Sequence, residues 1–352
     1  MVVRDPRGAF LGRALYSPAS EIRLRLLERE DRPIDTAWWA DRIRRALGRR
    51  EGIPATGYRV VHAEADGLPS LVIDRYGRCV VVQLLSAGLE ACRRDVIAAI
   101  LEVLEPDGIL LRNDVPVRRH EELPLDVELA AGSVPERIEV EEHGVRYVLN
   151  PWRGQKTGAF LDQRENRALA GELAGKPVGG RALDAFTYEG GFALHLARGG
   201  AESVLAADQS AEALARAGEN AVSNGLGNIE WVEANAFDLL RRLARDGERF
   251  HLVVLDPPAF AKSKRTVDRA LGGYKEINLR AMTLLAPGGR LLTFSCSYHV
   301  GRDLFLEMLA DAASDSGRAI ALERILGPAA DHPELLTIPE TGYLKGALLR
   351  AS

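Results

Sequence analysis

Short apolar runs alternate with stretches of helical spacing through the second half of the chain. This alternation predicts parallel strands joined by helices, as in doubly wound α/β folds. Polar residues follow four of the apolar runs directly, and open parallel sheets bind ligands where their strands end. These residues are Asp184, Asp208, Asn235 and Asp256. The pattern therefore predicts a ligand site along one edge of a Rossmann-like sheet.

The first half of the chain has a mixed pattern. Residues 9–16 and 22–27 read as strands, and the second alternates arginine with apolar residues, so we expect one basic and one buried face. Helical spacing follows over 35–50, and residues 58–149 read as an α+β region. We expect a small, mostly β segment over 1–32, a linker helix with an α+β middle domain over 33–150, and the Rossmann-like domain over 151–352.

Composition limits the class of protein. The 352 residues are 46% hydrophobic, which suffices for substantial cores, and no apolar run is long enough to span a bilayer. The three cysteines form neither a disulfide framework nor a zinc pattern, so we expect a cytoplasmic protein without a metal site. A homodimer is our expectation for the assembly state, although no sequence feature requires one.

Charge is unevenly distributed. Residues 1–60 hold thirteen arginines, no lysine and eight acids, a formal charge of +5, whereas the whole chain carries −4. Such asymmetry can mark a surface that faces nucleic acid. Arginine-rich solvated helices explain the count equally well.

The stretch from Asp184 to Phe192 reads as a strand end, a tight turn and a helix start. Gly190 and Gly191 would let the backbone approach a ligand closely. The pattern is not G-x-G-x-x-G, so it does not indicate a dinucleotide. An acid before the glycines suits a cationic ligand, such as the amino group of S-adenosylmethionine (AdoMet). Asp208 is placed to accept from ribose hydroxyls, and an adenine would fit near Asn235. A plain structural turn is the alternative.

Two further stretches carry candidate chemistry. Asp256-Pro257-Pro258 forms a rigid loop that directs carbonyl groups into the predicted site. Cys296 follows the next predicted strand, which places a thiol beside Asp256. A thiolate that adds to C6 of a pyrimidine makes C5 nucleophilic toward a methyl sulfonium. An inert buried cysteine is the alternative.

Residues 155–167 are dense in polar groups and lead into a helix just before the first sheet strand. We expect this stretch to form a lip over the cofactor pocket. A capped linker helix is the alternative.

In combination, these motifs resemble the bacterial class I 23S rRNA cytosine-C5 methyltransferases, over nearly the whole chain. The stretches that carry the resemblance are 154–158, 160–167, 184–192, 256–260, 273–278 and 294–297. The resemblance implies an RNA-binding PUA domain, an α+β middle domain, a Rossmann-like AdoMet domain and 23S rRNA as partner. It matches Cys296 to the nucleophile, and Asp256 to a cofactor residue that also holds cytosine N3. The cofactor-binding residues expected from motif and resemblance are Lys156, Gln163, Arg164, Asp184, Phe186, Thr187, Gly190, Gly191, Asp208, Gln209, Asn235, Ala236, Asp256 and Pro257.

The chain departs from the family pattern at two places. We expect it to hold only the last part of the PUA domain, because that domain normally begins well upstream of the matching segment. Ala259 stands in the region where another branch of cytosine-C5 enzymes has a second cysteine, so product release needs a different base.

Two other functions remain open at this point. The related guanine-N7 methyltransferases of 23S rRNA share an Asp-Pro-Pro-x-Phe motif and a basic stretch, here 262–265, but lack the thiol at Cys296. A non-catalytic RNA-binding protein that retains AdoMet is the third reading. The acids at Asp184, Asp208 and Asp256 speak against it.

Overall fold

The structure is a computed structural model, and it describes residues 1–175, 180–261 and 264–352. The chain divides into two compact units. The first comprises Met1–Leu161 and Ala330–Thr341, and the second comprises Asp162–Ala329 and Gly342–Ser352.

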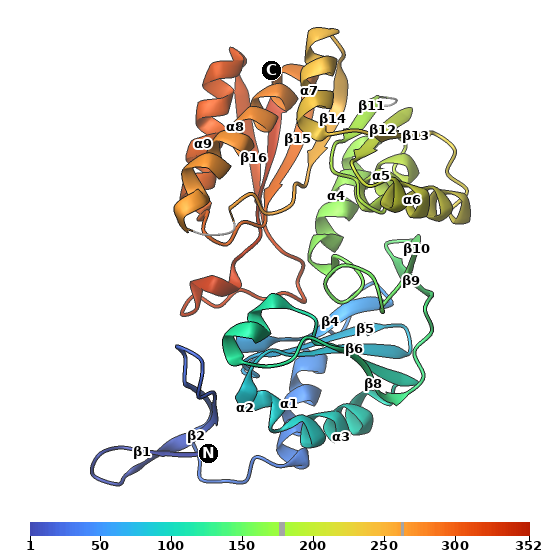
Figure 1. Ribbon diagram of the computed structural model, residues 1–352. Helices are drawn as coiled ribbons and strands as arrows, with labels where there is room; N and C mark the ends of the chain where they lie inside the picture. Colours follow the sequence, from blue (N-terminus) through green and yellow to red (C-terminus); the bar gives the residue numbers. More distant parts are fainter. Residues whose placement is uncertain (176–179, 262–263) are drawn as a thin grey trace. The chain divides into compact units, whose positions relative to one another are not determined.

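The second unit is built on a seven-stranded sheet with the strand order β13-β12-β11-β14-β15-β17-β16 (Figure 1). Its strands are β11 (Arg181–Asp184), β12 (Ser203–Asp208), β13 (Ile229–Glu233), β14 (Phe250–Leu255), β15 (Leu285–Ser295), β16 (Ile320–Leu326) and β17 (Lys345–Ala351). The five strands from β13 to β15 are parallel, and β17 runs antiparallel to both β15 and β16. The chain reverses its direction of sheet growth between β11 and β14, which is where doubly wound sheets bind ligands. The predicted Rossmann-like fold is confirmed.

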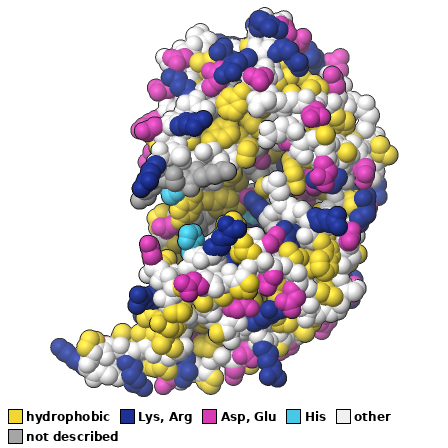
Figure 2. Space-filling view, viewed as in Figure 1, with side chains coloured by type: hydrophobic (Ala, Val, Ile, Leu, Met, Phe, Trp, Pro, Cys, Tyr) yellow, Lys and Arg dark blue, Asp and Glu magenta, His cyan; other side chains and the backbone are white. Residues whose placement is uncertain are grey.

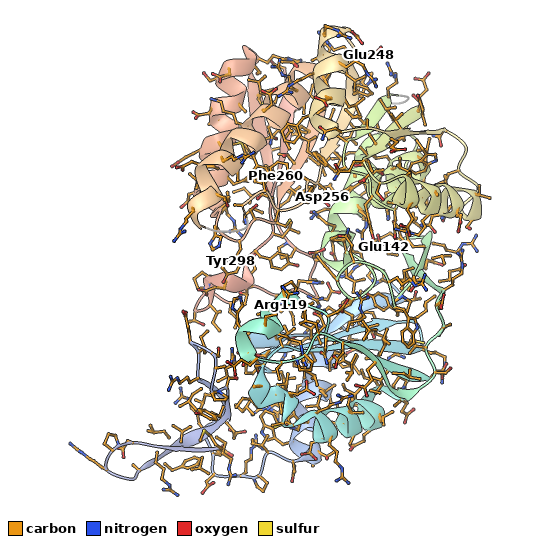
Figure 3. The ribbon with its side chains drawn as sticks, viewed as in Figure 1. Arg119, Glu142, Glu248, Asp256, Phe260 and Tyr298 are labelled. Carbon is orange, nitrogen blue, oxygen red and sulfur yellow. The ribbon has the colours of Figure 1, made fainter. Side chains whose placement is uncertain are left out.

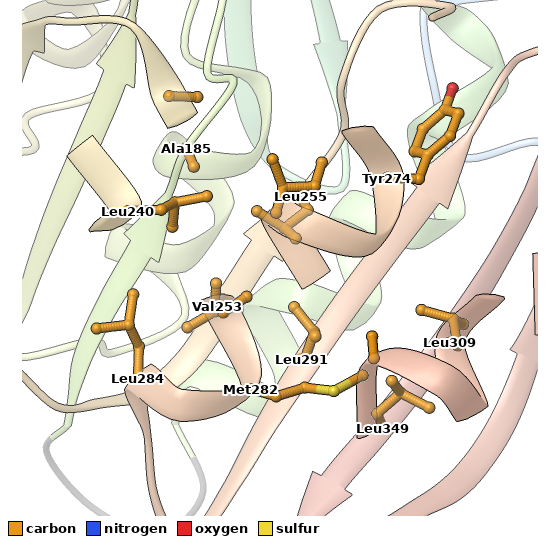
Figure 4. Packing of buried hydrophobic residues seen from close by; sticks show 14 of the residues in the cluster. Ala185, Leu240, Val253, Leu255, Tyr274, Met282, Leu284, Leu291, Leu309 and Leu349 are labelled. Carbon is orange, nitrogen blue, oxygen red and sulfur yellow. The ribbon is translucent and has the colours of Figure 1, made fainter. Parts of the chain in front are cut away.

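Helices cover both faces of this sheet. They are α4 (Arg164–Ala174), α5 (Gly191–Arg198), α6 (Ala211–Ser223), α7 (Ala236–Arg245), α8 (Val267–Leu284) and α9 (Arg302–Ser316). Apolar residues of α7, α8 and α9 form one core with the sheet, and residues of α4 and α5 form another on the opposite face. Figure 4 shows the first of these cores, where Leu240, Val253 and Met282 lie among buried neighbours. Strands buried on both faces explain the continuous apolar runs of the sequence.

The first unit contains a five-stranded mixed sheet and two smaller sheets. Its strands are β1 (Val2–Arg4), β2 (Phe10–Tyr16), β3 (Leu24–Glu28), β4 (Gly57–His62), β5 (Leu71–Tyr76), β6 (Cys79–Leu84), β7 (Gly108–Arg112), β8 (Val127–Gly132), β9 (Ile138–Glu142) and β10 (Val145–Leu149). Its helices are α1 (Thr36–Gly48), α2 (Ala87–Glu90) and α3 (Arg93–Leu104). Trp38 and Trp39 of α1 are buried in the core of this unit.

The N-terminal strands differ from the expected pattern of faces. In β3 the leucines at positions 24 and 26 are 46% and 40% exposed, whereas the Arg25 guanidinium is mostly buried and pairs with Glu121 at 2.9 Å. The expectation of one basic and one buried face is therefore wrong. Periodicity shows which residues share a face of a strand. It does not show which face is buried, because the ion-pair partner of Arg25 lies 96 residues away in sequence.

The boundary between the units also differs from the expected division at residue 150. Residues up to Leu161 belong to the first unit because Thr157 is hydrogen-bonded to Tyr76 at 3.0 Å and donates to Asp74. Residues 330–341 return to the same unit, where Asp331 accepts hydrogen bonds from the side chain of Arg50 and the main chain of Arg59. Residues 1–32 contain a three-stranded sheet of their own. That they form a segment distinct from the rest of the first unit stays a prediction.

Candidate active site

Acidic residues and the thiol meet at one edge of the sheet in the second unit. Asp184 and Asp208 end β11 and β12, Asp256 follows β14, and Cys296 follows β15. These four strands are adjacent and parallel, in the order β12-β11-β14-β15. Their carboxyl ends therefore lie along the same edge, as the sequence predicted. Figure 3 labels Asp256 and Phe260 on the segment that follows β14.

Asp184 is fully buried beneath this edge. Its Oδ2 accepts a hydrogen bond from the Ala193 main-chain N–H at 3.1 Å, and so pairs a donor in the first turn of α5. Its Oδ1 has no hydrogen bond of standard geometry among the described residues, although the Thr187 side chain and the Phe186 main-chain N–H lie near enough to the carboxyl to lower its pKa. Burial raises the pKa of the Asp184 carboxyl to about 7, and the negative charge of Asp256 adds to the rise. A cation beside Oδ1 would restore the charged form.

The turn after Asp184 is held by main-chain hydrogen bonds. Thr187 N–H donates to Ala207 O at 2.9 Å, and Gly190 N–H donates to Thr187 O at 2.9 Å. Phe186 packs partly buried against the core of this unit, so its side chain contributes to packing.

The two glycines have a packing reason that the sequence did not show. Gly190 has φ +87°, and a Cβ there would lie 3.1 Å from both Ala217 and Trp231. A Cβ on Gly191 would lie 3.1 Å from the side chain of Arg167. The missing side chains thus face protein atoms, which is a different reason from the predicted approach of a ligand.

Asp208 is held from both sides of its carboxylate. Oδ2 accepts from Tyr188 N–H and Oδ1 accepts from Ser210 N–H, each at 2.9 Å. A carboxylate offers about four acceptor positions, so two stay available for hydroxyl donors. The neighbouring Gln209 is exposed.

Asn235 acts as the N-cap of α7, where its Oδ1 accepts from Phe237 N–H at 3.0 Å. Ala236 is buried and belongs to the core beneath the helix. Asn235 is exposed, so its Nδ2 and the second acceptor position of its Oδ1 could contact a ligand.

The stretch before α4 reaches this edge through Gln163. Its Nε2 donates to Asp256 Oδ1 at 2.8 Å, and its Oε1 accepts from Asn166 Nδ2 at 2.6 Å. Arg164 is fully buried next to it and pairs with Glu165 at 2.9 Å. Gln163 and Asp256 were both predicted as site residues, and they are in direct contact. Lys156 belongs to the first unit, where its Nζ lies 4.4 Å from the Phe160 ring centroid.

Cys296 lies next to the Asp-Pro-Pro loop. Its Sγ donates to Pro257 O over 3.8 Å, and its side chain is partly exposed. The flanking Ser297 is buried, and its hydroxyl lies 2.8 Å from the Tyr274 hydroxyl and accepts from Ala261 N–H at 3.1 Å. The turn that carries the thiol is thus attached both to α8 and to the segment after Asp256.

Comparison with known proteins identifies the fold and the chemistry. The family model of S-adenosylmethionine-dependent methyltransferases matches residues 117–349. The chain belongs to this family. A protein named Ribosomal RNA large subunit methyltransferase I from Shewanella amazonensis is 43% identical over 353 residues, covering 97% of this chain and 88% of the relative. A protein of the same name from Tolumonas auensis is 42% identical over 99% of this chain and 89% of the relative.

Solved structures share the fold of this methyltransferase. One described as a SAM-dependent methyltransferase from Streptococcus mutans has a TM-score of 0.83 at 19% identity, covering 99% of this chain and 90% of that chain. Another, described as a methyltransferase complexed with SAH, has a TM-score of 0.85 at 20% identity and covers 99% and 91%. The predicted family and cofactor are confirmed.

The edge residues of the methyltransferase fit AdoMet. Asp184 Oδ1, which has no hydrogen bond of standard geometry, could accept from the amino group, and Asp208 retains acceptor positions for ribose hydroxyls. The contribution of each predicted residue to cofactor binding stays a proposal, because the placement of a residue does not establish its role.

Sequence reasoning missed one residue beside the thiol. Lys345 is 3% exposed, and its Nζ donates to Ser297 O at 2.7 Å. The signal was a single lysine within the otherwise apolar run 344–349.

The basic N-terminal stretch is largely neutralised by ion pairs. Nine of its thirteen arginines pair with carboxylates of the first unit. The remaining four, named here the exposed N-terminal arginines, are Arg4, Arg7, Arg23 and Arg29. Figure 2 shows side chains of both signs interspersed on one face of the protein. Of the predicted basic loop, Arg265 is exposed, whereas Lys262 and the side chain of Lys264 lie outside the described residues.

The described part of the chain contains no helix that is both long and apolar enough to cross a membrane.

Proposed function

We propose that this methyltransferase transfers a methyl group from AdoMet to C5 of a cytosine in 23S rRNA, with Cys296 as the covalent nucleophile. The relatives named Ribosomal RNA large subunit methyltransferase I support rRNA as the substrate class, at 41–43% identity over nearly the whole chain. The observation that carries the proposal is the position of the Cys296 thiol, 3.8 Å from the carbonyl of Pro257 in the Asp-Pro-Pro loop.

The proposed chemistry assigns one task to each group. Cys296 Sγ, as thiolate, bonds to cytosine C6, and the C5–C6 π electrons become available at C5. Bound AdoMet supplies an electrophilic methyl group on its sulfonium. Asp256, in its protonated form, would donate its proton to cytosine N3 as the thiolate adds, so that the negative charge entering the ring is neutralised there, and would take the proton back when the thiolate leaves. The C5 proton then leaves to a base, the C6–S bond breaks, and the thiolate is regenerated.

The release step needs a group other than residue 259. Ala259 carries no acid or base, although it lies in the loop that begins with Asp256. A homodimeric assembly and a cytoplasmic location stay predictions alongside this proposal.

The experiment compares rRNA from cells lacking this protein after complementation with wild type, Cys296→Ser or Cys79→Ser. Cys79 is buried in the first unit and serves as the matched control. Bisulfite sequencing should show one protected cytosine with wild type and with Cys79→Ser, and none with Cys296→Ser. Full protection with Cys296→Ser would refute the covalent mechanism. Loss of a modified guanine in the deletion strain, with no change at any cytosine, would favour guanine-N7 methylation.

A further inference from the structure

A buried lysine lies against the turn that carries Cys296. Lys345 begins β17 opposite Ser295 of β15 and is 3% exposed. Its Nζ donates to Ser297 O and to Tyr343 O, each at 2.7 Å. Burying an ammonium group costs free energy unless its environment compensates. The two carbonyls belong to the turn that carries the thiol and to the segment before β17, so the lysine joins these two segments.

The Lys345 ammonium fixes one side of the thiol turn. Ser297 directly follows Cys296, and its carbonyl is held by Lys345 while its hydroxyl is held by α8 through Tyr274. The Ser297 N–H donates to Ser295 Oγ at 3.3 Å and closes the turn. The main chain on both sides of Cys296 is thereby fixed in place.

Two elements beside the thiol turn contribute groups that carry no positive charge. From the loop after β14, Pro257 O accepts from Sγ, and the residue before Pro257 is the acidic Asp256. From α8, Tyr274 faces the turn with a hydroxyl whose pKa is raised by burial, so it is neutral at pH 7. A cation near the turn would offset these influences, because positive charge favours a thiolate.

Lys345 is also connected to the stretch before α4. Tyr343, whose carbonyl accepts from Lys345, donates its hydroxyl to Asp162 Oδ2 at 2.6 Å. The adjacent Gln163 donates to Asp256 Oδ1 at 2.8 Å. The groups around the thiol and around Asp256 therefore share one hydrogen-bonded frame.

We propose that Lys345 is a positioning residue for methyl transfer, whose buried ammonium holds the Ser297 carbonyl and stabilises the Cys296 thiolate. This inference rests on the proposed function, since that function is what requires a thiolate. Lys345 acts through Cys296 and the turn, without contact to the base or to AdoMet.

The test measures the alkylation rate of Cys296 by iodoacetamide from pH 5.5 to 10 in the full-length protein. Peptide mass spectrometry reports on Cys296 separately from Cys79 and Cys92. The wild type should show an apparent thiol pKa below about 7.5, against about 8.5 for a free cysteine. Lys345→Met should raise this pKa by at least about one unit, which is a roughly tenfold loss of thiolate at pH 7.

Two control variants separate charge from structure. Lys345→Arg keeps the positive charge and should stay close to the wild-type pKa. Lys275→Met removes a lysine of α8 that pairs with Asp315 at 2.8 Å, and should leave the Cys296 pKa unchanged.

A wild-type pKa at or above about 8.5 would overturn the proposal without any Lys345 variant, so a misfolded Lys345→Met does not leave it untested. An unchanged pKa in folded Lys345→Met would overturn it as well. The alkylation assay needs no RNA, so its outcome is independent of the proposed function. If Cys296→Ser still methylates RNA, the covalent mechanism fails while the thiol pKa continues to report on Lys345.

Discussion

Replacing Asp184 by asparagine should stabilise the free protein at alkaline pH and weaken AdoMet binding. Asp184 is fully buried, with one carboxylate oxygen bonded to Ala193 N–H and the other without a hydrogen bond of standard geometry among the described residues. Asparagine keeps the shape and can accept from Ala193 N–H through its amide oxygen. It removes only the ability to become a buried anion.

The magnitude follows from the pKa. Burial raises the Asp184 pKa from 3.8 to about 7. Between these values the folded protein holds a proton that the unfolded chain has released, so stability falls as the pH rises through this window. For a pKa difference of about three units, the buried charge lowers the free energy of unfolding by at most roughly 4 kcal/mol. This loss is complete above pH 7 and absent below pH 4.

Urea denaturation at pH 4.5 and pH 8 would measure this effect. The free energy of unfolding of Asp184→Asn should exceed that of the wild type by about 2–4 kcal/mol at pH 8, and by much less at pH 4.5. An equal difference at both pH values would show that Asp184 does not titrate near neutrality, and would refute the reasoning.

The same titration should appear in cofactor binding. An AdoMet ammonium beside Asp184 selects the charged carboxylate, so wild-type affinity should rise from pH 5.5 to pH 7.5, by up to about tenfold per unit. Asp184→Asn should bind more weakly at pH 7.5 and show a flatter profile. Calorimetry in two buffers of different ionisation enthalpy should detect proton release in the wild type below pH 7. A wild-type affinity without pH dependence would place the ammonium elsewhere.

Three further changes test other parts of the account. Asp208→Ala should lower AdoMet affinity by about 1–3 kcal/mol in calorimetry, because ribose hydroxyls lose their acceptor; unchanged affinity would remove Asp208 from the site. Gly190→Ala should lower the free energy of unfolding by about 1–3 kcal/mol, since φ is +87° and its Cβ would crowd Ala217. The control Gly225→Ala has φ +67° but open space around it, so it should lower the free energy of unfolding by less. Charge reversal of the exposed N-terminal arginines should weaken RNA binding and flatten its salt dependence. Charge reversal of the ion-paired Arg44 should change neither. If reversal of the exposed N-terminal arginines leaves the salt dependence unchanged, RNA binds to another surface.

The ligand edge of the sheet was predictable because its signals are local. An apolar run followed by an acid identifies a strand end, and adjacent parallel strands bring Asp184, Asp256 and Cys296 to one edge. The roles of the glycines were less predictable. Positive φ is readable from Gly190 itself, but the approach of Trp231 depends on β13, which lies 39 residues further along.

Features that depend on distant partners could not be predicted. The Arg25–Glu121 pair reversed the expected burial of β3, because periodicity does not reveal which charges are paired. The return of residues 330–341 to the first unit depends on Asp331 meeting Arg50 and Arg59. The same applies to Lys345. An isolated lysine in an apolar run is unusual, but the sequence does not show that it contacts the turn after Cys296.

The most direct test of the central claim uses an rRNA fragment that contains 5-fluorocytidine at the position found by bisulfite sequencing. The C5 fluorine cannot leave as a proton, so a covalent enzyme is arrested after methyl transfer. Incubation with wild-type protein and AdoMet should give an adduct that survives denaturing electrophoresis, and mass spectrometry should locate the RNA on the peptide containing Cys296. Cys296→Ser should give no adduct while it still binds AdoMet. An enzyme that methylates unmodified RNA but forms no adduct with the fluorinated fragment would contradict the account.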